Sequence, residues 1–485
     1  MKNKVLTLIY SILLSLSIVI SNNVEYSGYI DDSYKNNYIK SFDIKSLLIF
    51  LVLTIIIYFV LHSILKKLEK INLKISTSDN SIFLKVFLPI LIVFFICFTV
   101  FFPGIKTIDS EMILMYKNTI SNQHPLMYIK FFSLFFTIFK NYTLASSIYS
   151  LIQMTIVAIS ISYVINWLYK KGIKKSILVI IICYYILFPV FAIYSITFTK
   201  DVLFSTFILL LIPITYDIIS KKEISIKQFI YFCILSILSI VFKNNGYIVI
   251  ILFMLVIILS INKKNDFIIY CFIILIISFV PKSFSNEQLF KETVDIPIQQ
   301  ISAVIANDGN ITPKEEKFIN QIIITSLIKN KFSPLTSDSI KWDSSFNDSY
   351  LNRHKKEFIN TWFNLFRKNK LIYIKQYMLQ TYFFWRPSIL ENVYIDNLNN
   401  KTIYNAIYFN SYFFSHGFIL WSTLFLILLA IKKEKYIVFK LIIPLIGLYF
   451  SIFIGTPIST QFRYILPIVI CLPILYTLCF LEKKY

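Results

Sequence analysis

Residues 46–65 read SLLIFLVLTIIIYFVLHSIL, an apolar run of 20 residues without a charged side chain. A helix needs about 20 apolar residues to cross a bilayer core of about 30 Å. Similar runs recur along the chain. We expect about twelve membrane-spanning helices, at residues 5–21, 46–65, 86–102, 144–168, 176–195, 201–219, 228–242, 246–261, 266–281, 412–431, 436–454 and 462–481. The sequence therefore predicts an all-α polytopic membrane protein.

The composition agrees with this class. Hydrophobic residues make up 57% of the 485 residues and charged residues 15%, and the mean hydropathy is +0.69. Soluble domains have about 45–50% apolar and about 25% charged residues. These values exclude an ordinary soluble enzyme, a disordered chain and a fibrous protein. Eight glycines argue against a glycine-rich nucleotide-binding domain. The six cysteines lie in apolar runs without metal-like spacing and are interpreted as small core residues.

The lysines predict the orientation. The net charge is +22, and the lysines gather between the apolar runs rather than on a soluble domain. Strict alternation of the spans puts every cluster on one side, which the positive-inside rule assigns to the cytoplasm. The clusters are Lys2 and Lys4; Lys66, Lys67, Lys70 and Lys74; Lys170, Lys171, Lys174 and Lys175; Lys221, Lys222 and Lys227; Lys263 and Lys264; Lys432, Lys433 and Lys435; Lys483 and Lys484. We therefore predict a multi-pass cell-membrane protein with both termini in the cytoplasm and no role in nucleic-acid binding.

The spans divide the chain into four parts. These are residues 1–84, a two-helix membrane addition with a cytoplasmic loop; 85–281, a transmembrane module whose first outer loop is 103–143; 282–411, an extracytoplasmic region; and 412–485, the C-terminal transmembrane helices. The extracytoplasmic region is expected to be mainly helical, with amphipathic stretches near 313–330 and 352–382 and a loop at 333–350.

Five polar stretches lie at the outer ends of predicted spans, and each alone has an ordinary structural explanation. They are PGIKTIDSE (103–111), SNQHP (121–125), TFTKD (197–201), KNNG (243–246) and QFRY (461–464). The acids of the first fit a solvated loop, and His-Pro fits a helix start. The Lys-Asp pair fits an interfacial ion pair, Asn-Gly a tight turn, and the arginine a side chain that snorkels to the surface.

Together the five stretches indicate chemistry. They combine acids, cations and a histidine on one face of the membrane. That composition suits a site that deprotonates a hydroxyl and stabilises a phosphate leaving group. ATP and nucleotide sugars are cytoplasmic, so a lipid phosphate is the activated substrate available outside.

Six short motifs follow one another between about residues 85 and 480. They are FFPGIKTIDSEMIL, SNQHPLMY, TFTKDVLFSTF, FKNNGYIV, FINTWFNLFRKNKLIYIKQYMLQTYFFWRP and QFRYILPIV. In this order they resemble the GT-C superfamily of polytopic glycosyltransferases, and more closely a poorly characterised bacterial group within it. The chain departs from that group at Gln123, where a histidine is frequent, and at Lys243, where arginine is common.

The resemblance implies a fold and a reaction. Members of the superfamily move a sugar from a polyprenyl-phosphate-linked donor to an acceptor outside the cytoplasm, here a glycan, a lipid or a protein at the cell surface. Their catalytic acid follows the first helix of the conserved module. In this chain that helix is 86–102 and the acid is Asp109, which we expect to accept the proton of the acceptor hydroxyl.

The remaining polar residues receive supporting roles by the same reasoning. Lys200, Lys243 and Arg463 are the candidates for binding the donor phosphate. Glu111 and His124 either orient the acceptor or, with Asp201, hold a divalent metal such as Mg²⁺ or Mn²⁺. The extracytoplasmic region, through Trp362, Trp385 and Arg386, is expected to cover the site.

Three other interpretations stay open. A lipid-linked oligosaccharide polymerase or ligase also acts outside the cytoplasm with many spans, and relies on outer arginines and a histidine. A transporter or flippase of polysaccharide or lipid predicts polar residues near the bilayer midplane and an internal repeat, neither of which is visible. A non-catalytic descendant would keep only the scaffold.

Overall fold

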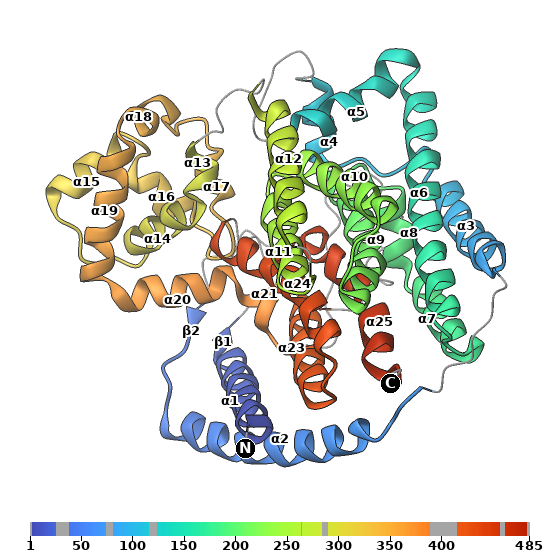
Figure 1. Cartoon of the computed structure of the whole chain (residues 1–485). Coiled ribbons are helices and arrows are strands. Elements are labelled where there is room, and N and C mark those ends of the chain that lie inside the picture. Colours follow the sequence, from blue (N-terminus) through green and yellow to red (C-terminus); the bar gives the residue numbers. More distant parts are fainter. Residues whose placement is uncertain are drawn as a thin grey trace.

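The computed structural model describes residues 2–25, 38–73, 81–115, 124–262, 264–283, 290–388, 415–455 and 461–482 (Figure 1). This part of the chain is predominantly helical. Its one sheet is a short antiparallel pair, β1 (Val24–Glu25) with β2 (Tyr38–Ile39). The predicted all-helical class is therefore confirmed in its coarse form.

Six described helices are long and apolar enough to cross a membrane. They are α1 (Lys2–Asn22), α2 (Ile44–Glu69), α3 (Phe83–Val100), α6 (Tyr142–Lys170), α9 (Lys200–Lys221) and α24 (Tyr436–Ile454). A seventh span is formed if α7 (Lys175–Leu187) and α8 (Pro189–Ser195) count as one, with a bend of 60° between them. The chain is thus a multi-pass, membrane-embedded protein.

The other predicted spans also contain described helices. They are α10 (Ile226–Phe242), α11 (Gly246–Ile258), α12 (Lys264–Ser283), α23 (His416–Lys432) and α25 (Leu466–Phe480). A further apolar helix, α5 (Leu126–Ile138), follows the short α4 (Ile108–Met115). Every one of the twelve predicted segments therefore contains a helix or the bent pair. That all twelve cross the bilayer stays a prediction.

Helix α9 lies at the centre of the membrane part. It contacts α6, α10, α24 and α25, and most of its side chains are buried (Figure 1). Helix α2 is the opposite case. It contacts α1 and α23 and leaves most of its apolar side chains exposed. A helix that is apolar on all sides and is left largely uncovered by the rest of the protein suits contact with lipid.

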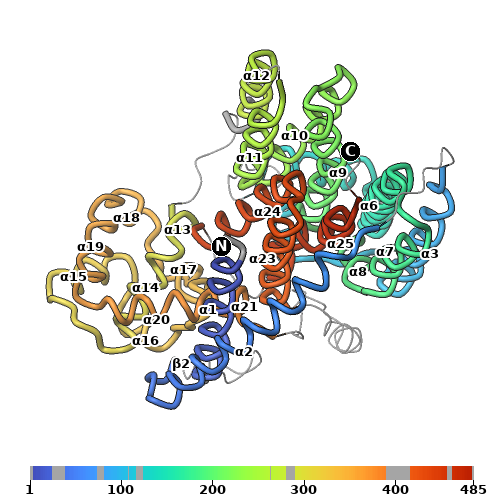
Figure 2. Tube along the Cα trace, turned by 60° about the horizontal axis from the view of Figure 1, so that its bottom comes forward, coloured from blue at the N-terminus to red at the C-terminus, as the bar shows by residue number. Residues whose placement is uncertain are grey.

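Residues 290–388 form a separate group of short helices beside the membrane part (Figures 1 and 2). The group comprises α13 (Phe290–Thr293), α14 (Asp295–Ala306), α15 (Pro313–Asn320), α16 (Thr325–Lys331), α17 (Asp338–Lys341), α18 (Asp348–Arg353), α19 (Lys355–Lys368), α20 (Lys370–Gln380) and α21 (Tyr382–Trp385). It has its own apolar core. The loop predicted at 333–350 is wrong in part, because α17 and the start of α18 fall inside it.

A buried lysine explains why α17 forms there. Lys341 is 1% exposed, and its Nζ lies 2.9 Å from Asp295, 2.9 Å from Asp338 and 3.2 Å from Glu292. Burial opposes the charged lysine, but these carboxylates outweigh it and raise the pKa of Lys341 above its ordinary value. The turn of α17 thus carries the cation that neutralises the acids of α13 and α14.

Candidate functional site

Two polar stretches meet through a short parallel bridge. The N–H of Ile105 donates to the carbonyl of Ile196 at 3.0 Å, and the N–H of Phe198 donates to the carbonyl of Ile105 at 2.9 Å. The hydroxyl of Thr107 then donates to the carbonyl of Phe198 at 2.9 Å. Since α4 and α9 begin directly after these residues, the bridge brings Asp109 next to Lys200.

A glycine makes this close approach feasible. Gly104 has a φ of +127°, and a Cβ added there would lie 2.2 Å from Ser150 Oγ and 2.7 Å from the Phe198 ring. A side chain at this position would therefore be strained and would collide with α6. From the same helix, the Gln153 amide donates to the carbonyls of Ser195 (3.0 Å) and Thr197 (2.9 Å). Helix α6 thus fixes both sides of the bridge.

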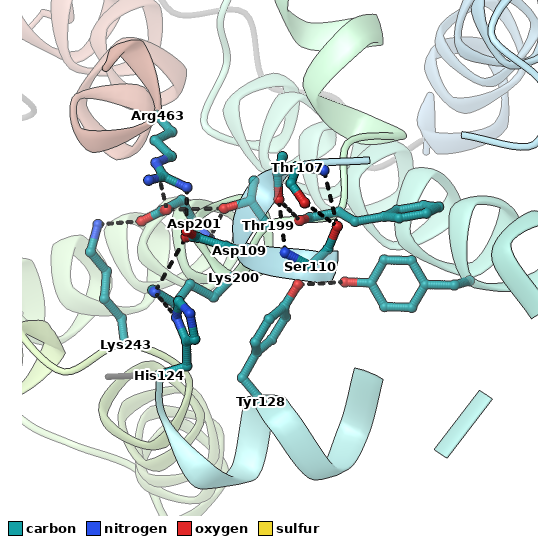
Figure 3. Close-up of polar contacts among 12 residues, drawn as sticks. Thr107, Asp109, Ser110, His124, Tyr128, Thr199, Lys200, Asp201, Lys243 and Arg463 are labelled. Carbon is teal, nitrogen blue, oxygen red and sulfur yellow. Dashed lines mark hydrogen bonds and ion pairs between the residues drawn. The ribbon is translucent and has the colours of Figure 1, made fainter. Parts of the chain in front are cut away.

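Five charged residues form one connected cluster (Figure 3). Arg463 Nη1 donates to Asp109 Oδ2 at 2.7 Å, and Lys200 Nζ lies 3.9 Å from the same oxygen. Lys243 Nζ donates to Asp201 Oδ1 at 2.6 Å, and Arg463 Nε lies 4.0 Å from Asp201 Oδ2. Arg463 therefore bridges the two acids.

The cluster has a closed half and an open half. The side chains of Asp201 and Lys243 are 1% and 6% exposed. Those of Asp109, Lys200 and Arg463 are 24%, 16% and 15% exposed. The first pair is sealed inside the protein, whereas a ligand can reach the other three side chains.

His124 contacts the open half through Lys200. It stands just before α5, and Lys200 Nζ lies 2.8 Å from its Nδ1 (Figure 3). The side chain is buried. Burial and then the neighbouring Lys200 lower the pKa of His124 to about 3. The imidazole is therefore neutral at physiological pH.

The charge state of Asp109 is equally well defined. Burial alone would raise its pKa, but Arg463 and Lys200 outweigh that effect and hold the pKa well below its usual range. Asp109 is therefore a carboxylate in the ligand-free protein.

Helix starts surround the same cluster. Asp109 lies in the first turn of α4, Lys200 opens α9, and Arg463 lies in the 3-10 turn (Phe462–Tyr464) directly before α25. The N-terminal ends of helices carry partial positive charge and favour anions. Together with three cationic side chains, this arrangement is suited to an anionic ligand.

A comparison with known families places the chain. The family model described as "Family of unknown function (DUF6020)" matches residues 111–412, which is more than half of the sequence. The chain belongs to the DUF6020 family. No curated protein and no solved structure matches it.

The DUF6020 match covers part of the cluster. Residues His124, Lys200, Asp201 and Lys243 lie inside the matched range, whereas Asp109 and Arg463 lie outside it. The cluster therefore joins residues of the DUF6020 region to residues on either side of it.

The structure brings together six of the seven residues predicted for the site. Asp109, His124, Lys200, Asp201, Lys243 and Arg463 are linked by the contacts above, while their chemical roles stay predictions. Glu111 has no ion pair with the cluster among the described residues. Gln123 lies outside the described residues.

Two residues of the site lie in the predicted polar stretches but were given no role from the sequence. The ring of Tyr464 lies 5.7 Å from Lys243 Nζ and 5.3 Å from Arg463 Cζ, within range of a cation–π contact. The hydroxyl of Thr199 donates to Asp201 Oδ2 at 3.1 Å and caps α9. Tyr464 directly follows Arg463 in the sequence, which was the only signal available for it.

Among the described residues, the side chains predicted to cover the site make their contacts outside the charged cluster. Trp362 donates to the side chain of Gln300 at 2.8 Å, inside the 290–388 group. Trp385 donates to Thr381, and Arg386 lies over the ring of Tyr382. The carbonyl of Trp385 also accepts from Ser17 of α1 and from the Trp421 indole of α23, each at 2.8 Å, so this residue ties the group to the membrane part.

The predicted metal site does not fit the residues present. No group of three His, Cys, Asp or Glu side chains able to hold a metal occurs among the described residues. Asp201 is already bound by Lys243 and lies near Arg463. Cations in these positions repel a metal ion, so we assign Asp201 to the internal ion pair.

Proposed function

We propose that this protein is a GT-C-type membrane glycosyltransferase. It would move a sugar from a polyprenyl-phosphate-linked donor to a cell-surface acceptor outside the cytoplasm. One observation carries the proposal: the partly exposed carboxylate of Asp109 lies between two partly exposed cations, Arg463 and Lys200. A base beside an anion-binding pair is what this transfer requires.

The contacts between loops support twelve spans with an extracytoplasmic site. Lys433 Nζ donates to the backbone carbonyls of Leu68, Glu69 and Ile71, and the N–H of Asn262 donates to the carbonyl of Lys222. Loops that carry the predicted cytoplasmic lysines therefore meet one another. Lys74, Lys483 and Lys484 lie outside the described residues.

The charged cluster lies at the other ends of the helices. Helix α9 has Lys200 at its first residue and Lys221 at its last. If Lys221 faces the cytoplasm, as the positive-inside rule expects, then Lys200 and the cluster around it face outward. This placement agrees with a lipid-phosphate donor.

The reaction follows from the charges. The donor phosphate contacts Arg463 and Lys200, which draws both cations from Asp109 and raises the pKa of its carboxyl toward a useful value for a base. The acceptor oxygen forms a bond to the anomeric carbon while the bond from that carbon to the phosphate oxygen breaks. The hydroxyl proton passes to Asp109, and the electron pair leaves with the polyprenyl phosphate.

The closed half of the cluster has a different task. Lys243 is neutralised by Asp201 and almost fully buried. We therefore assign phosphate contact to Arg463 and Lys200, and assign to Lys243 and Asp201 the positioning of the start of α9. The ring of Tyr464 lies within cation–π range of Lys243 and of Arg463, so it contacts both halves of the cluster.

The direct test is Asp109→Asn in proteoliposomes supplied with polyprenyl-phosphate-linked sugars and cell-envelope acceptors. Loss of a general base is expected to lower transfer by about 10²–10⁴-fold. Asp217→Asn is the matched control, because Asp217 is ion-paired with Lys171 at the other end of α9. Transfer at the wild-type rate by correctly inserted Asp109→Asn would remove the proposal.

A lipid-linked oligosaccharide polymerase or ligase is the second candidate. It is favoured by the presence of Arg463 and His124 in one site, joined through Lys200. Abolition of activity by Arg463→Ala, with activity retained by Asp109→Asn, would support this function instead.

A further inference from the structure

The imidazole of His124 is held in one orientation. The residue precedes Pro125, whose carbonyl accepts from the N–H of Ile129 at 3.0 Å as α5 begins. On the other side, Lys200 Nζ lies 2.8 Å from His124 Nδ1. His124 is 7% exposed, so its contact with Lys200 is not readily exchanged for water.

The contact with Lys200 fixes the tautomer. An ammonium group has three donors and no acceptor. Lys200 Nζ also lies 3.9 Å from the Asp109 carboxylate, whose oxygens only accept, so its hydrogens are directed at acceptors on both sides. Nδ1 of His124 must therefore accept, and in a neutral imidazole the hydrogen is then on Nε2.

That Nε2–H group has no hydrogen-bond partner among the described residues, and its nitrogen is buried. A buried donor without an acceptor is costly, and native proteins rarely keep one without a reason. The donor belongs to a ring that contacts Lys200, one of the three partly exposed side chains of the cluster. A ligand oxygen is the partner that this position lacks.

We infer that His124 donates a hydrogen bond from Nε2–H to an oxygen of the bound substrate. The identity of that substrate rests on the proposed function, and the oxygen belongs either to the donor phosphate or to a sugar or acceptor hydroxyl. Unlike Arg463 and Lys200, His124 supplies a directional contact without adding charge. A protonated Nε2 also has no lone pair for a metal, so His124 binds substrate directly rather than through an ion.

Three variants separate this role from a structural one. His124→Gln places an amide N–H near the position of Nε2, whereas His124→Asn offers an acceptor to Lys200 near the position of Nδ1. His124→Phe keeps a ring and provides neither group. We expect His124→Gln to retain transfer within a few-fold of wild type. His124→Asn and His124→Phe should lose about 5- to 100-fold, the range for an unmade buried hydrogen bond. The opposite ranking, with Asn active and Gln inactive, would show that His124 only supports Lys200 and would overturn the inference.

Binding of sugar-free polyprenyl phosphate to protein in nanodiscs distinguishes the two oxygen sources. Weaker binding by His124→Phe than by His124→Gln assigns the contact to the phosphate. Equal binding, combined with a higher KM of His124→Phe for the acceptor or a lower kcat, assigns it to a hydroxyl. Equal binding and equal kinetics of all three variants would contradict any substrate contact.

Nitrogen NMR of histidine-labelled protein gives a readout independent of activity. The His124 signal is assigned by its loss in His124→Gln. We expect Nε2 protonated and Nδ1 unprotonated from pH 5 to 8, with a shift of the Nε2–H signal on adding polyprenyl phosphate or the full substrate. Protonation of both nitrogens near pH 6.5 would overturn the inference. Failure of the wild type to bind or transfer any polyprenyl-phosphate compound, with the Nε2–H tautomer present, would instead contradict the proposed function.

Discussion

The buried pair of Lys243 and Asp201 gives the sharpest quantitative prediction. Lys243→Met removes the ammonium that lies 2.6 Å from Asp201 Oδ1, while the Asp201 side chain remains 1% exposed. Removing one partner of a buried ion pair costs about 3–5 kcal/mol, because the other charge stays desolvated. Arg463 Nε lies 4.0 Å from Asp201 and compensates in part, so we expect the lower end, about 3 kcal/mol.

A double-mutant cycle measures this quantity. The variants are Lys243→Met, Asp201→Asn and the double substitution, each followed by thermal unfolding of detergent-solubilised protein. For a chain of 485 residues, about 3 kcal/mol corresponds to a fall of about 3 °C in Tm. The double variant should lose less than the sum of the single ones, because neither charge remains. Lys130→Met on α5 is the control, since Lys130 is exposed and has no ion pair in the described part of the chain.

Two results would refute this reasoning. The first is a Tm for Lys243→Met equal to that of Lys130→Met, which would mean that Asp201 is not a buried anion. The second is strict additivity in the cycle, which would mean that the two residues act independently.

Three further predictions concern charge elsewhere. Acidification from pH 7 to 5 should destabilise the wild type by about 2 kcal/mol more than His124→Gln. The pKa of His124 is about 3 in the folded protein and 6.5 in the unfolded chain, so the unfolded chain binds the proton first and stability falls as the pH drops below 6.5. Equal changes of Tm in the two proteins would contradict a buried neutral imidazole. Arg463→Lys keeps the charge but loses the guanidinium contact with Asp109, so kcat/KM for transfer should fall about 10- to 100-fold. Unchanged kinetics would refute the importance of that contact. Lys341→Met leaves Asp295 buried without its cation and should destabilise residues 290–388 by about 3 kcal/mol or more. Limited proteolysis of that region should then be faster, and an unchanged rate of proteolysis would contradict the buried ion pair.

Helix positions could be predicted because each apolar run is about as long as a membrane crossing. The bend between α7 and α8 was not predicted, although Pro189 starts α8. A proline at a helix start and a proline in a continuous kinked helix look alike in one sequence, and only packing against other helices decides between them. The short helices at 338–353 were missed for a related reason. They depend on buried ion pairs with α13 and α14, which no local pattern reveals.

The sequence predicted which residues form the site, but not which acid contacts which cation. Polar residues at span ends indicated that acids and cations gather on one face. Which acid faces which cation depends on the bridge between Ile105 and Thr197, which brings together residues some 90 positions apart. Glu111 shows the limit of proximity in sequence. It lies two residues after Asp109 on α4, and residues i and i+2 of a helix do not face the same side.

The charge balance of the cluster connects these observations to the proposed reaction. Lys200, Lys243 and Arg463 oppose the carboxylates of Asp109 and Asp201, and His124 is neutral, which leaves one excess positive charge. A phosphodiester donor carries one negative charge and matches that excess. During transfer the leaving phosphate gains a second negative charge while Asp109 takes up the acceptor proton and becomes neutral. Neutral Asp109 then no longer competes with the phosphate for Arg463 and Lys200. The two cations therefore bind the developing dianion more strongly than the bound donor, which is the difference that accelerates a reaction.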